Sequence, residues 1–373
     1  MKKYIIAIAI ISLLAISMSA AAQGASTKGL KDAIKDRFLI GTAMNTRQIM
    51  ETDTPAVHLI QKHFNAIVAE NCMKSMYLQP REGEFFFEEA DRLAAFAEKY
   101  GMTLTGHTLI WHSQAPLWFF VDSNGNPASR ELLIERMRRH ITTVVGRYKG
   151  RVKGWDVVNE AVLDDGRLRD SPFLKIIGPE YLSLAYQFAR EADPDAELYY
   201  NDYSMAIPQK REGVVRMVRS LIEGGARIDA IGMQGHLNME FPSVDEFEKS
   251  LLAFASLGVK VMITELDLSA LPEPQPQAGS DVGRRVAADK TLNPYTEGLT
   301  VEAENAWSNH LLAFFDLFRQ HSDKITRVTF WGVSDATSWK NNFPVFGRTD
   351  YPLIFDRAHK EKPVVDMIIK LYE

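Results

Sequence analysis

Two glutamates at the ends of apolar runs carry the chemistry that this sequence indicates. The run 155–158 leads through Asn159 to Glu160, and the run 259–264 leads to Glu265. Continuous apolar, β-branched runs of this length are typical of buried strands, so each glutamate is expected at the carboxyl end of a strand. Two carboxyl groups brought together at one edge of a fold are the groups needed to cleave a glycosidic bond.

The neighbours of the two glutamates predict different roles for them. A retaining glycosidase uses one carboxylic acid to protonate the leaving oxygen and a carboxylate about 5–5.5 Å away to attack the anomeric carbon, whereas an inverting enzyme needs a wider gap for a water. Glu160 leaves an apolar strand beside Trp155, where desolvation would raise its pKa. Glu265 shares its rim with His236, a partner for the ionised form. We therefore predict Glu160 as the acid/base and Glu265 as the nucleophile; for either glutamate alone, a structural ion pair is the alternative.

Strands and helices that must position these residues alternate along the chain. Apolar runs indicate eight strands, over 38–43, 64–71, 103–111, 155–160, 197–203, 230–236, 260–268 and 327–335. Amphipathic periodicity, with capping glycines at Gly101 and Gly258, indicates eight helices, over 54–63, 88–100, 129–148, 179–192, 208–223, 243–257, 300–321 and 361–372.

This alternation predicts an α/β fold, a closed (β/α)8 TIM barrel that forms a single catalytic domain over residues 23–373. The strands are continuously apolar, which indicates burial on both faces, as in a parallel sheet covered by helices. An open, doubly wound sheet is the alternative, but no glycine-rich phosphate loop follows the first strand. Residues 271–300, rich in proline and then carrying Arg284 and Arg285, interrupt the rhythm and are expected to be either a functional rim loop or a disordered flap.

Polar or aromatic residues end nearly every predicted strand, and in a barrel these ends meet on the rim where active sites lie. They are Glu70, Asn71, His107, Trp111, Asn159, Glu160, 201–203, Gln234, His236, Glu265, Asp267, Trp331 and Asp335. Four aromatic residues of the rim, Trp111, Tyr203, Trp331 and Trp339, indicate a carbohydrate site because flat rings stack on the C–H faces of sugars. A single tryptophan, in contrast, is more often a core residue.

A metal-dependent barrel hydrolase is the alternative that His107, His112 and His236 raise. Such a site needs several histidines and carboxylates close together, and residues five apart on a strand, such as His107 and His112, point to opposite faces. We therefore predict no metal. Lys74 is expected to donate to sugar hydroxyls rather than to form a Schiff base, because activation of such a lysine needs an apolar pocket.

The first 22 residues have the layout of a secretory signal peptide: Lys2 and Lys3, an apolar run over 5–16, then alanines before Gln23. An uncleaved anchor is the alternative, but the run is shorter than the ~20 residues of a membrane span. Cys72 is the only cysteine, so no intramolecular disulfide can form. The net charge of -5, without basic runs, argues against nucleic acid and anionic membranes as partners.

Four motifs closely resemble the family 10 glycoside hydrolases, which are retaining endo-1,4-β-xylanases on a (β/α)8 barrel. They are GHTLIWHSQ at 106–114, WDVVNEA at 155–161, ITELDL at 263–268 and TFWGVSDATSW at 329–339. The similarity runs from about Phe38 to the C-terminus. It implies an endo-1,4-β-xylanase that hydrolyses internal bonds of xylan or xylo-oligosaccharides without a cofactor. The alternatives are a retaining glycosidase for another β-linked glucan or mannan and a non-catalytic carbohydrate-binding barrel.

The resemblance assigns roles position by position, and it agrees that Glu160 is the acid/base and Glu265 the nucleophile. Asn159 matches the amide that holds the sugar 2-hydroxyl, His236 the histidine bonded to the nucleophile, and Gln234 the support of the acid/base. Tyr203 matches an aromatic residue near the first aglycone position. Residues matching the glycone side are Glu70, Asn71, Lys74, His107, Trp111, Gln114, Trp331 and Trp339.

Three departures from the family pattern concern sugar contacts rather than catalysis. Cys72 stands where glutamate often follows Glu-Asn, Ser204 stands where asparagine often follows Asn-Asp-Tyr, and 271–300 is inserted after the nucleophile strand. We further expect a monomer that is exported to the periplasm or the medium and has no membrane contact after signal cleavage.

Overall fold

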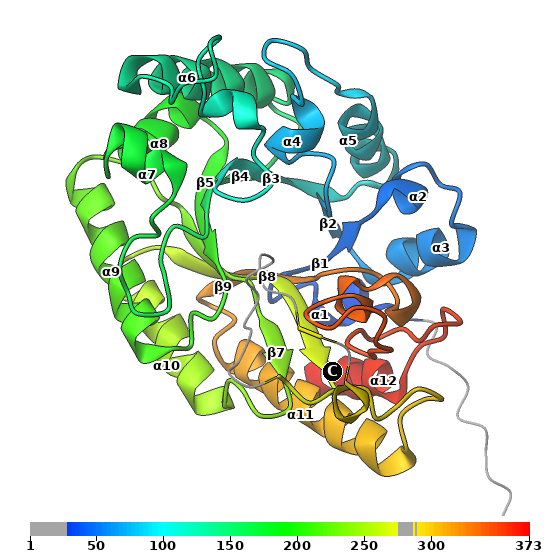
Figure 1. Cartoon of the computed structure of the whole chain (residues 1–373). Helices are drawn as coiled ribbons and strands as arrows, with labels where there is room; N and C mark the ends of the chain where they lie inside the picture. The colour runs from blue at the N-terminus through cyan, green and yellow to red at the C-terminus, as the bar shows by residue number, and fades with distance from the viewer. Residues whose placement is uncertain (1–27, 275–285, 288) are drawn as a thin grey trace, which may run out of the picture.

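Eight parallel strands close into a barrel with helices around it in the computed structural model, which describes residues 28–274, 286–287 and 289–373 (Figure 1). The strands of the barrel are β1 (Leu39–Met44), β2 (Ala66–Ala69), β3 (Thr103–Trp111), β4 (Gly154–Asn159), β5 (Glu197–Asp202), β6 (Ala230–Met233), β8 (Lys260–Ser269) and β9 (Ile325–Phe330). Pairing of β6 with β8 and of β9 with β1 closes the ring. The predicted (β/α)8 barrel is confirmed, whereas the predicted signal peptide over residues 1–22 lies outside the described residues.

All eight predicted helices are present. They are α3 (Thr54–His63), α5 (Glu88–Tyr100), α6 (Arg130–Arg147), α8 (Tyr181–Ala192), α9 (Pro208–Glu223), α10 (Val244–Ala255), α11 (Val301–Gln320) and α12 (Pro363–Tyr372). Local chemistry sets their ends: Gly101 ends α5 in the left-handed conformation, with φ at 63°, and the Ser129 side chain caps α6 by accepting from the Leu132 N–H.

Within the part of the chain that the structure describes, four short α-helices were not predicted, because four to six residues are too few to display helical periodicity. They are α1 (Leu30–Ile34), α2 (Thr46–Ile49), α4 (Ser75–Leu78) and α7 (Pro172–Ile177).

Two predicted strands, 230–236 and 327–335, end three or more residues earlier than their sequences indicated, and a glycine with a positive φ lies just beyond the end of each. Gly235, with φ at 81°, separates β6 from the short strand β7 (His236–Asn238), which pairs with β8. Gly332, with φ at 126°, turns the chain just after β9. Both positions suit glycine because an L side chain rarely adopts such a φ. As a result His236 and Trp331 lie beyond regular barrel strands, on the rim.

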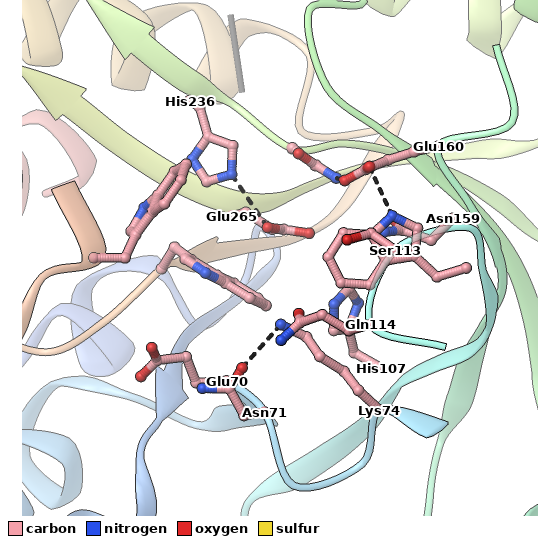
Figure 2. A pocket seen from close by; sticks show the side chains of 14 residues that line it. Glu70, Asn71, Lys74, His107, Ser113, Gln114, Asn159, Glu160, His236 and Glu265 are labelled. Carbon is pink, nitrogen blue, oxygen red and sulfur yellow. Dashed lines mark hydrogen bonds and ion pairs between the residues drawn. The ribbon is translucent and has the colours of Figure 1, made fainter. Parts of the chain in front are cut away.

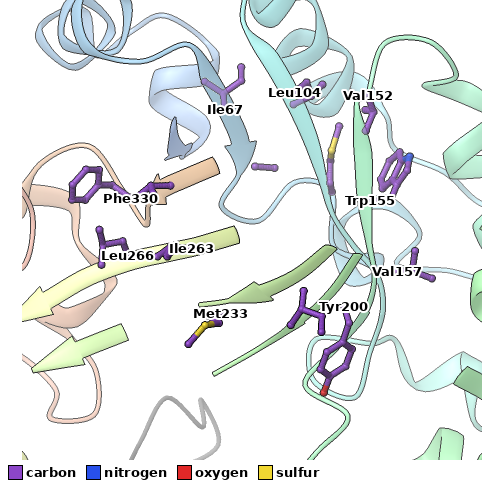
Figure 3. Close-up of a cluster of buried hydrophobic side chains, with 14 of the residues drawn as sticks. Ile67, Leu104, Val152, Trp155, Val157, Tyr200, Met233, Ile263, Leu266 and Phe330 are labelled. Carbon is purple, nitrogen blue, oxygen red and sulfur yellow. The ribbon is translucent and has the colours of Figure 1, made fainter. Parts of the chain in front are cut away.

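Apolar side chains fill both faces of the barrel wall. The large outer cluster, between strands and helices, includes Ile67 and Tyr200 (Figure 3). Their neighbours Val68 and Tyr199 belong to small separate clusters. Because side chains alternate along a strand, the small clusters lie on the opposite, inner face. The cluster of Val68 also contains Trp331, so the inner face leads directly to the rim.

Gly106 shows how closely the outer layer is packed. A Cβ atom at this position would lie 2.0 Å from Cε3 of Trp155, the residue opposite it on β4. Trp155 is fully buried and also contacts the ring of Tyr148 after α6. The absence of a side chain at Gly106 therefore leaves space for Trp155, which packs between the barrel wall and the helix layer.

The described part of the 271–300 insertion is hydrogen-bonded to the loop 344–351. The Val286 N–H donates to Pro344 O at 3.0 Å, the Thr349 N–H donates to Asn293 Oδ1 at 3.0 Å, and the Tyr351 hydroxyl donates to Tyr295 O at 2.6 Å. This part is thus attached to a loop that follows β9, and the remainder, residues 275–285 and 288, lies outside the described residues. Among the helices that the structure describes, none is long and apolar enough to cross a membrane.

Candidate active site

One rim pocket of about 360 Å³ brings together thirteen of the fourteen predicted site residues (Figure 2). It is lined by Glu70, Asn71, Lys74, His107, Trp111, Ser113, Gln114, Asn159, Glu160, Gln234, His236, Glu265, Trp331 and Trp339. Ser113 was not predicted, although it lies inside the motif at 106–114. The lining is rich in carboxylates, amides and indole rings, which suits a ligand with many hydroxyl groups and apolar C–H faces.

Glu160 stands just beyond β4 with both carboxyl oxygens in hydrogen bonds from neutral groups. Trp111 Nε1–H donates to Oε2 at 2.7 Å and Gln234 Nε2–H donates to Oε1 at 3.1 Å. Burial, helped by the negative charge of Asp202, raises the pKa of Glu160 to about 7, although the two hydrogen bonds oppose the rise. Trp155, which we expected beside Glu160, instead packs outward against Gly106 and Tyr148.

Glu265 lies within β8 and accepts hydrogen bonds from His236 Nε2–H at 3.2 Å and from Asn201 Nδ2–H at 2.8 Å. Burial alone would raise its pKa, but the hydrogen bond from His236, the nearby His107 and the Asn201 amide together lower it below its ordinary value. The two glutamates therefore differ in protonation in the direction that acid and nucleophile require.

His236 is held as a cation between two carboxylates. Its Nδ1–H donates to Asp267 Oδ2 at 2.9 Å while its Nε2–H donates to Glu265, and Trp339 Nε1–H donates to the same Asp267 oxygen at 2.8 Å. Burial would lower the pKa of His236, but the charge and hydrogen bond of Asp267, with Glu265, raise it to about 9. A protonated imidazole thus faces the nucleophile at neutral pH.

Asn201, at the end of β5, links the two catalytic strands. Its Nδ2 group donates to Asn159 Oδ1 at 2.8 Å as well as to Glu265 Oε1, and Thr264 Oγ1–H donates to its Oδ1 at 2.5 Å. The sequence placed Asn201 on the rim but gave it no role. Its position on the same rim as Asn159 and Glu265 was the sequence feature that could have indicated a role. Its hydrogen bonds to both residues form only when the barrel is closed.

Basic and acidic side chains from the loop after β2 and from β3 line the side of the pocket near Lys74. Lys74 Nζ donates to Asn71 Oδ1 at 3.1 Å and lies 5.1 Å from the Trp111 ring centre. Burial lowers the pKa of Lys74 and raises that of Glu70, each against the attraction of nearby opposite charges. His107 Nδ1 is bonded to Asp156 Oδ2 at 2.9 Å, which fixes the ring orientation.

Tyr203 is the predicted site residue that the pocket does not include. It is only 4% exposed; Arg169 NH2 donates to its hydroxyl at 2.7 Å, and Lys210 Nζ lies 3.7 Å from its ring centre. It therefore belongs to a polar network with Arg169 and Lys210, and its predicted role near the first aglycone position stays a prediction. Its neighbour Ser204 has φ at 50° and lines a small adjoining cavity with Gln234 and His236.

The structure also shows the surroundings of Cys72 and of the histidines that were considered as metal ligands. Cys72 is buried, and burial raises the pKa of its thiol. Over residues 28–274, 286–287 and 289–373, no group of three or more histidine, cysteine or acidic side chains could hold a metal ion. His236, one of the three histidines considered as ligands, uses both ring nitrogens to bind carboxylates.

Comparison with known proteins gives consistent matches. The family model described as glycosyl hydrolase family 10 matches residues 29–371. Similar relatives are endo-1,4-beta-xylanase A of Xylanibacter ruminicola, 50% identical over 363 residues that cover 97% of this chain and 98% of the relative, and endo-1,4-beta-xylanase B of Paenibacillus barcinonensis, 42% identical over 335 residues that cover 89% and 95%.

A solved structure of a GH10 endoxylanase retrieved from a sugarcane soil metagenome superposes with a TM-score of 0.90 at 43% identity, covering 92% of this chain and 100% of that one. The family match spans nearly all of the described barrel, including both glutamates and the residues that hold them. The chain therefore belongs to glycosyl hydrolase family 10.

Proposed function

We propose that the protein is an endo-1,4-β-xylanase that hydrolyses xylan by retaining double displacement. The observation that carries the mechanism is the contrast between two buried carboxyl groups in one pocket: burial raises the pKa of Glu160 to about 7, whereas hydrogen bonds and nearby imidazoles lower that of Glu265. The substrate follows from the family and from its relatives, which are endo-1,4-beta-xylanases.

In the first step, the Glu265 carboxylate attacks the anomeric carbon while Glu160 donates its proton to the leaving oxygen. His236 and Asn201 hold the two oxygens of Glu265. Because Asn201 donates to Asn159 Oδ1, Asn159 directs its NH2 group to the hydroxyl beside the reacting carbon. Lys74 and Glu70 bind hydroxyls, and Trp111, Trp331 and Trp339 bind C–H faces.

In the second step, Glu160 must change from acid to base. The negative charge of Glu265 contributes to the raised pKa of Glu160, and this charge disappears when Glu265 becomes an ester in the glycosyl-enzyme. The pKa of Glu160 therefore falls once the intermediate forms, so that it can take a proton from the incoming water. The chemistry of the first step thus prepares the second.

The test is reducing-end release by the purified protein on xylan, with mixed-linkage β-glucan and mannan in parallel and Glu265→Gln as the control. Xylan cleavage that disappears in the control is expected, and proton NMR of the first products should show the β-anomer. Activity confined to another polysaccharide would overturn the substrate, and an α-anomer first product would overturn retention.

We also propose that the protein is exported from the cytoplasm and that it is a monomer. The support is the signal-peptide layout of residues 1–22 and a single cysteine, which is compatible with an oxidising compartment. N-terminal sequencing of the exported chain should give Gln23 as the first residue, and light scattering should give the mass of one chain. Retention of Met1 in a membrane fraction would contradict export by cleavage.

A further inference from the structure

A fully buried ion pair lies behind the acid/base. Asp202 ends β5 and Lys210 stands in the first turn of α9, and both side chains are 0% exposed. Lys210 Nζ lies 2.9 Å from Asp202 Oδ1 and 3.3 Å from Asp164 Oδ1, and 3.7 Å from the ring centre of Tyr203. Neither Asp202 nor Lys210 lines the pocket, so neither contacts the substrate.

The surroundings of Asp202 are those of an ionised carboxylate. Oδ2 accepts from the Tyr200 hydroxyl at 2.5 Å and from the Val162 N–H at 3.3 Å, and Oδ1 accepts from the Tyr203 N–H at 2.9 Å in addition to the Lys210 ammonium. Every one of these groups is a donor toward Asp202. A carboxyl group that only accepts is the deprotonated form.

Helix formation does not explain why a lysine occupies position 210. The first turn of α9 carries the positive end of the helix dipole, which disfavours a cation, and burial of an ammonium group is unfavourable unless the group is paired. The presence of Lys210 at this position is therefore explained by its pairing with Asp202. Helix formation does not explain the pair, so we look for its role in the active site.

Backbone hydrogen bonds hold Asp202 close to the acid/base. The Glu160 N–H donates to Asn201 O at 2.9 Å, and the Val162 N–H, two residues further on, reaches the Asp202 carboxylate. Apart from burial, the charge of Asp202 is the largest contribution to the raised pKa of Glu160, ahead of that of Glu265. The other charged groups facing Glu160 are Arg169, whose Nε–H donates to the Glu160 carbonyl at 2.8 Å, and Lys74 across the pocket.

Taking the role of Glu160 as proposed above, we propose that Asp202 is a positioning residue that keeps the proton on Glu160, and that Lys210 holds the Asp202 carboxylate in place by pairing with it. The negative charge behind Glu160 disfavours a second negative charge in front of it. Glu160 then keeps its proton up to near-neutral pH and can deliver it to the leaving oxygen. The buried pair extends the active pH range upward.

Asp202→Asn tests this directly, because it removes the charge and keeps the shape. The basic limb of the kcat/KM profile on a xylo-oligosaccharide should move down by about one pH unit, whereas the acidic limb set by Glu265 stays in place. The matched control is Asp164→Asn, which removes the other, half-exposed partner of Lys210 and should leave both limbs unchanged. A purely structural role of Asp202 predicts an equal loss of activity at every pH, and that result would overturn the proposal.

The double variant Asp202→Asn/Lys210→Met removes both charges and covers the case in which the single variant fails to fold, because a neutral buried pair leaves no uncompensated cation. Its basic limb should move in the same direction by a smaller amount. An unmoved basic limb in the folded double variant would also contradict the proposal.

Titration of ¹³C-labelled Glu160 separates this proposal from the xylanase assignment. The resonance, identified by its absence in Glu160→Gln, should titrate at lower pH in Asp202→Asn, and no substrate is needed. A parent protein that does not cleave xylan would overturn the proposed function alone. An unchanged Glu160 titration in Asp202→Asn would overturn the role of Asp202 alone.

Discussion

The two catalytic glutamates are equally buried, each 5% exposed, yet their neighbours differ in kind. Glu160 accepts from the neutral groups of Trp111 and Gln234 and has Asp202 behind it, whereas Glu265 faces the imidazolium of His236 and the amide of Asn201. Burial raises the pKa of both groups, so it does not distinguish them. The sign of the nearest charge decides which carboxyl group keeps its proton.

The backbone around the two glutamates differs as well. Glu265 lies inside the regular strand β8, whereas Glu160 lies just beyond β4 with φ at 58°, a conformation that is costly for a residue with a side chain. Arg169 stabilises this turn by donating a hydrogen bond to the Glu160 carbonyl. The backbone of Glu265 thus lies within a regular strand, whereas the backbone of Glu160 lies beyond its strand and is held by one hydrogen bond to Asn201 O of β5 and one from the Arg169 side chain.

The sharpest way to break this comparison is to remove each carboxyl group in turn and supply azide as a substitute. Glu265→Ala and Glu160→Ala should each lose activity on xylan by roughly 10³-fold or more. With an aryl xylobioside, azide should yield the α-glycosyl azide from Glu265→Ala, because it attacks directly, and the β-glycosyl azide from Glu160→Ala, because it attacks the glycosyl-enzyme. Product NMR distinguishes the two, and interchanged anomers would reverse the assigned roles.

Removing the cation beside the nucleophile should make the two sites more alike. In His236→Gln the imidazolium no longer opposes the effect of burial, so the pKa of Glu265 should rise. The acidic limb of the kcat/KM profile should therefore move to higher pH by about one to two units, and kcat should fall about 100-fold. His321, which pairs with Glu248 at 2.7 Å outside the pocket, provides the control His321→Gln. An acidic limb that stays in place would show that His236 does not set the ionisation of Glu265.

Asn201→Ala removes the amide that connects the two sides. One hydrogen bond to an ionised nucleophile and one to Asn159 are lost, so kcat should fall about tenfold. Thr264→Val, which removes only the hydroxyl that orients Asn201, should have a smaller effect of the same kind. Steady-state kinetics on xylotriose measure both, and a change in KM alone would mean that Asn201 acts on binding rather than on the nucleophile.

The smallest effect concerns the strained backbone on the Glu160 side. Ser204 has φ at 50°, and asparagine tolerates this region better than serine. Ser204→Asn should therefore raise the free energy of unfolding by about 0.5 kcal/mol, measured by urea denaturation. Ser204→Ala is the comparison variant, since alanine gains nothing in this conformation. Equal stabilities of the two variants would show that backbone strain at 204 is negligible.

Much of the fold could be predicted because periodicity is local. Continuous apolar runs and capping residues determined the order of strands and helices, and the rule that parallel strands share one rim then placed thirteen of the fourteen site residues in one pocket. The break between β6 and β7 was missed because a positive φ at Gly235 is not marked by hydrophobicity. The contacts of Tyr203 with Arg169 and Lys210 could not be predicted, because a strand-end aromatic residue does not reveal which way its ring points.

The sequence by itself determined the barrel and the family and predicted the roles of the two glutamates, because these depend on residue types and on spacing along the chain. Only the tertiary structure decided how each glutamate is held. Asn201 is hydrogen-bonded to both Asn159 and Glu265. Asp267 favours the protonated form of His236. Asp202 lies behind Glu160 and is paired with Lys210. These pairs join residues that are close only when the barrel is closed, and electrostatic interactions depend on distance in space rather than on separation in sequence.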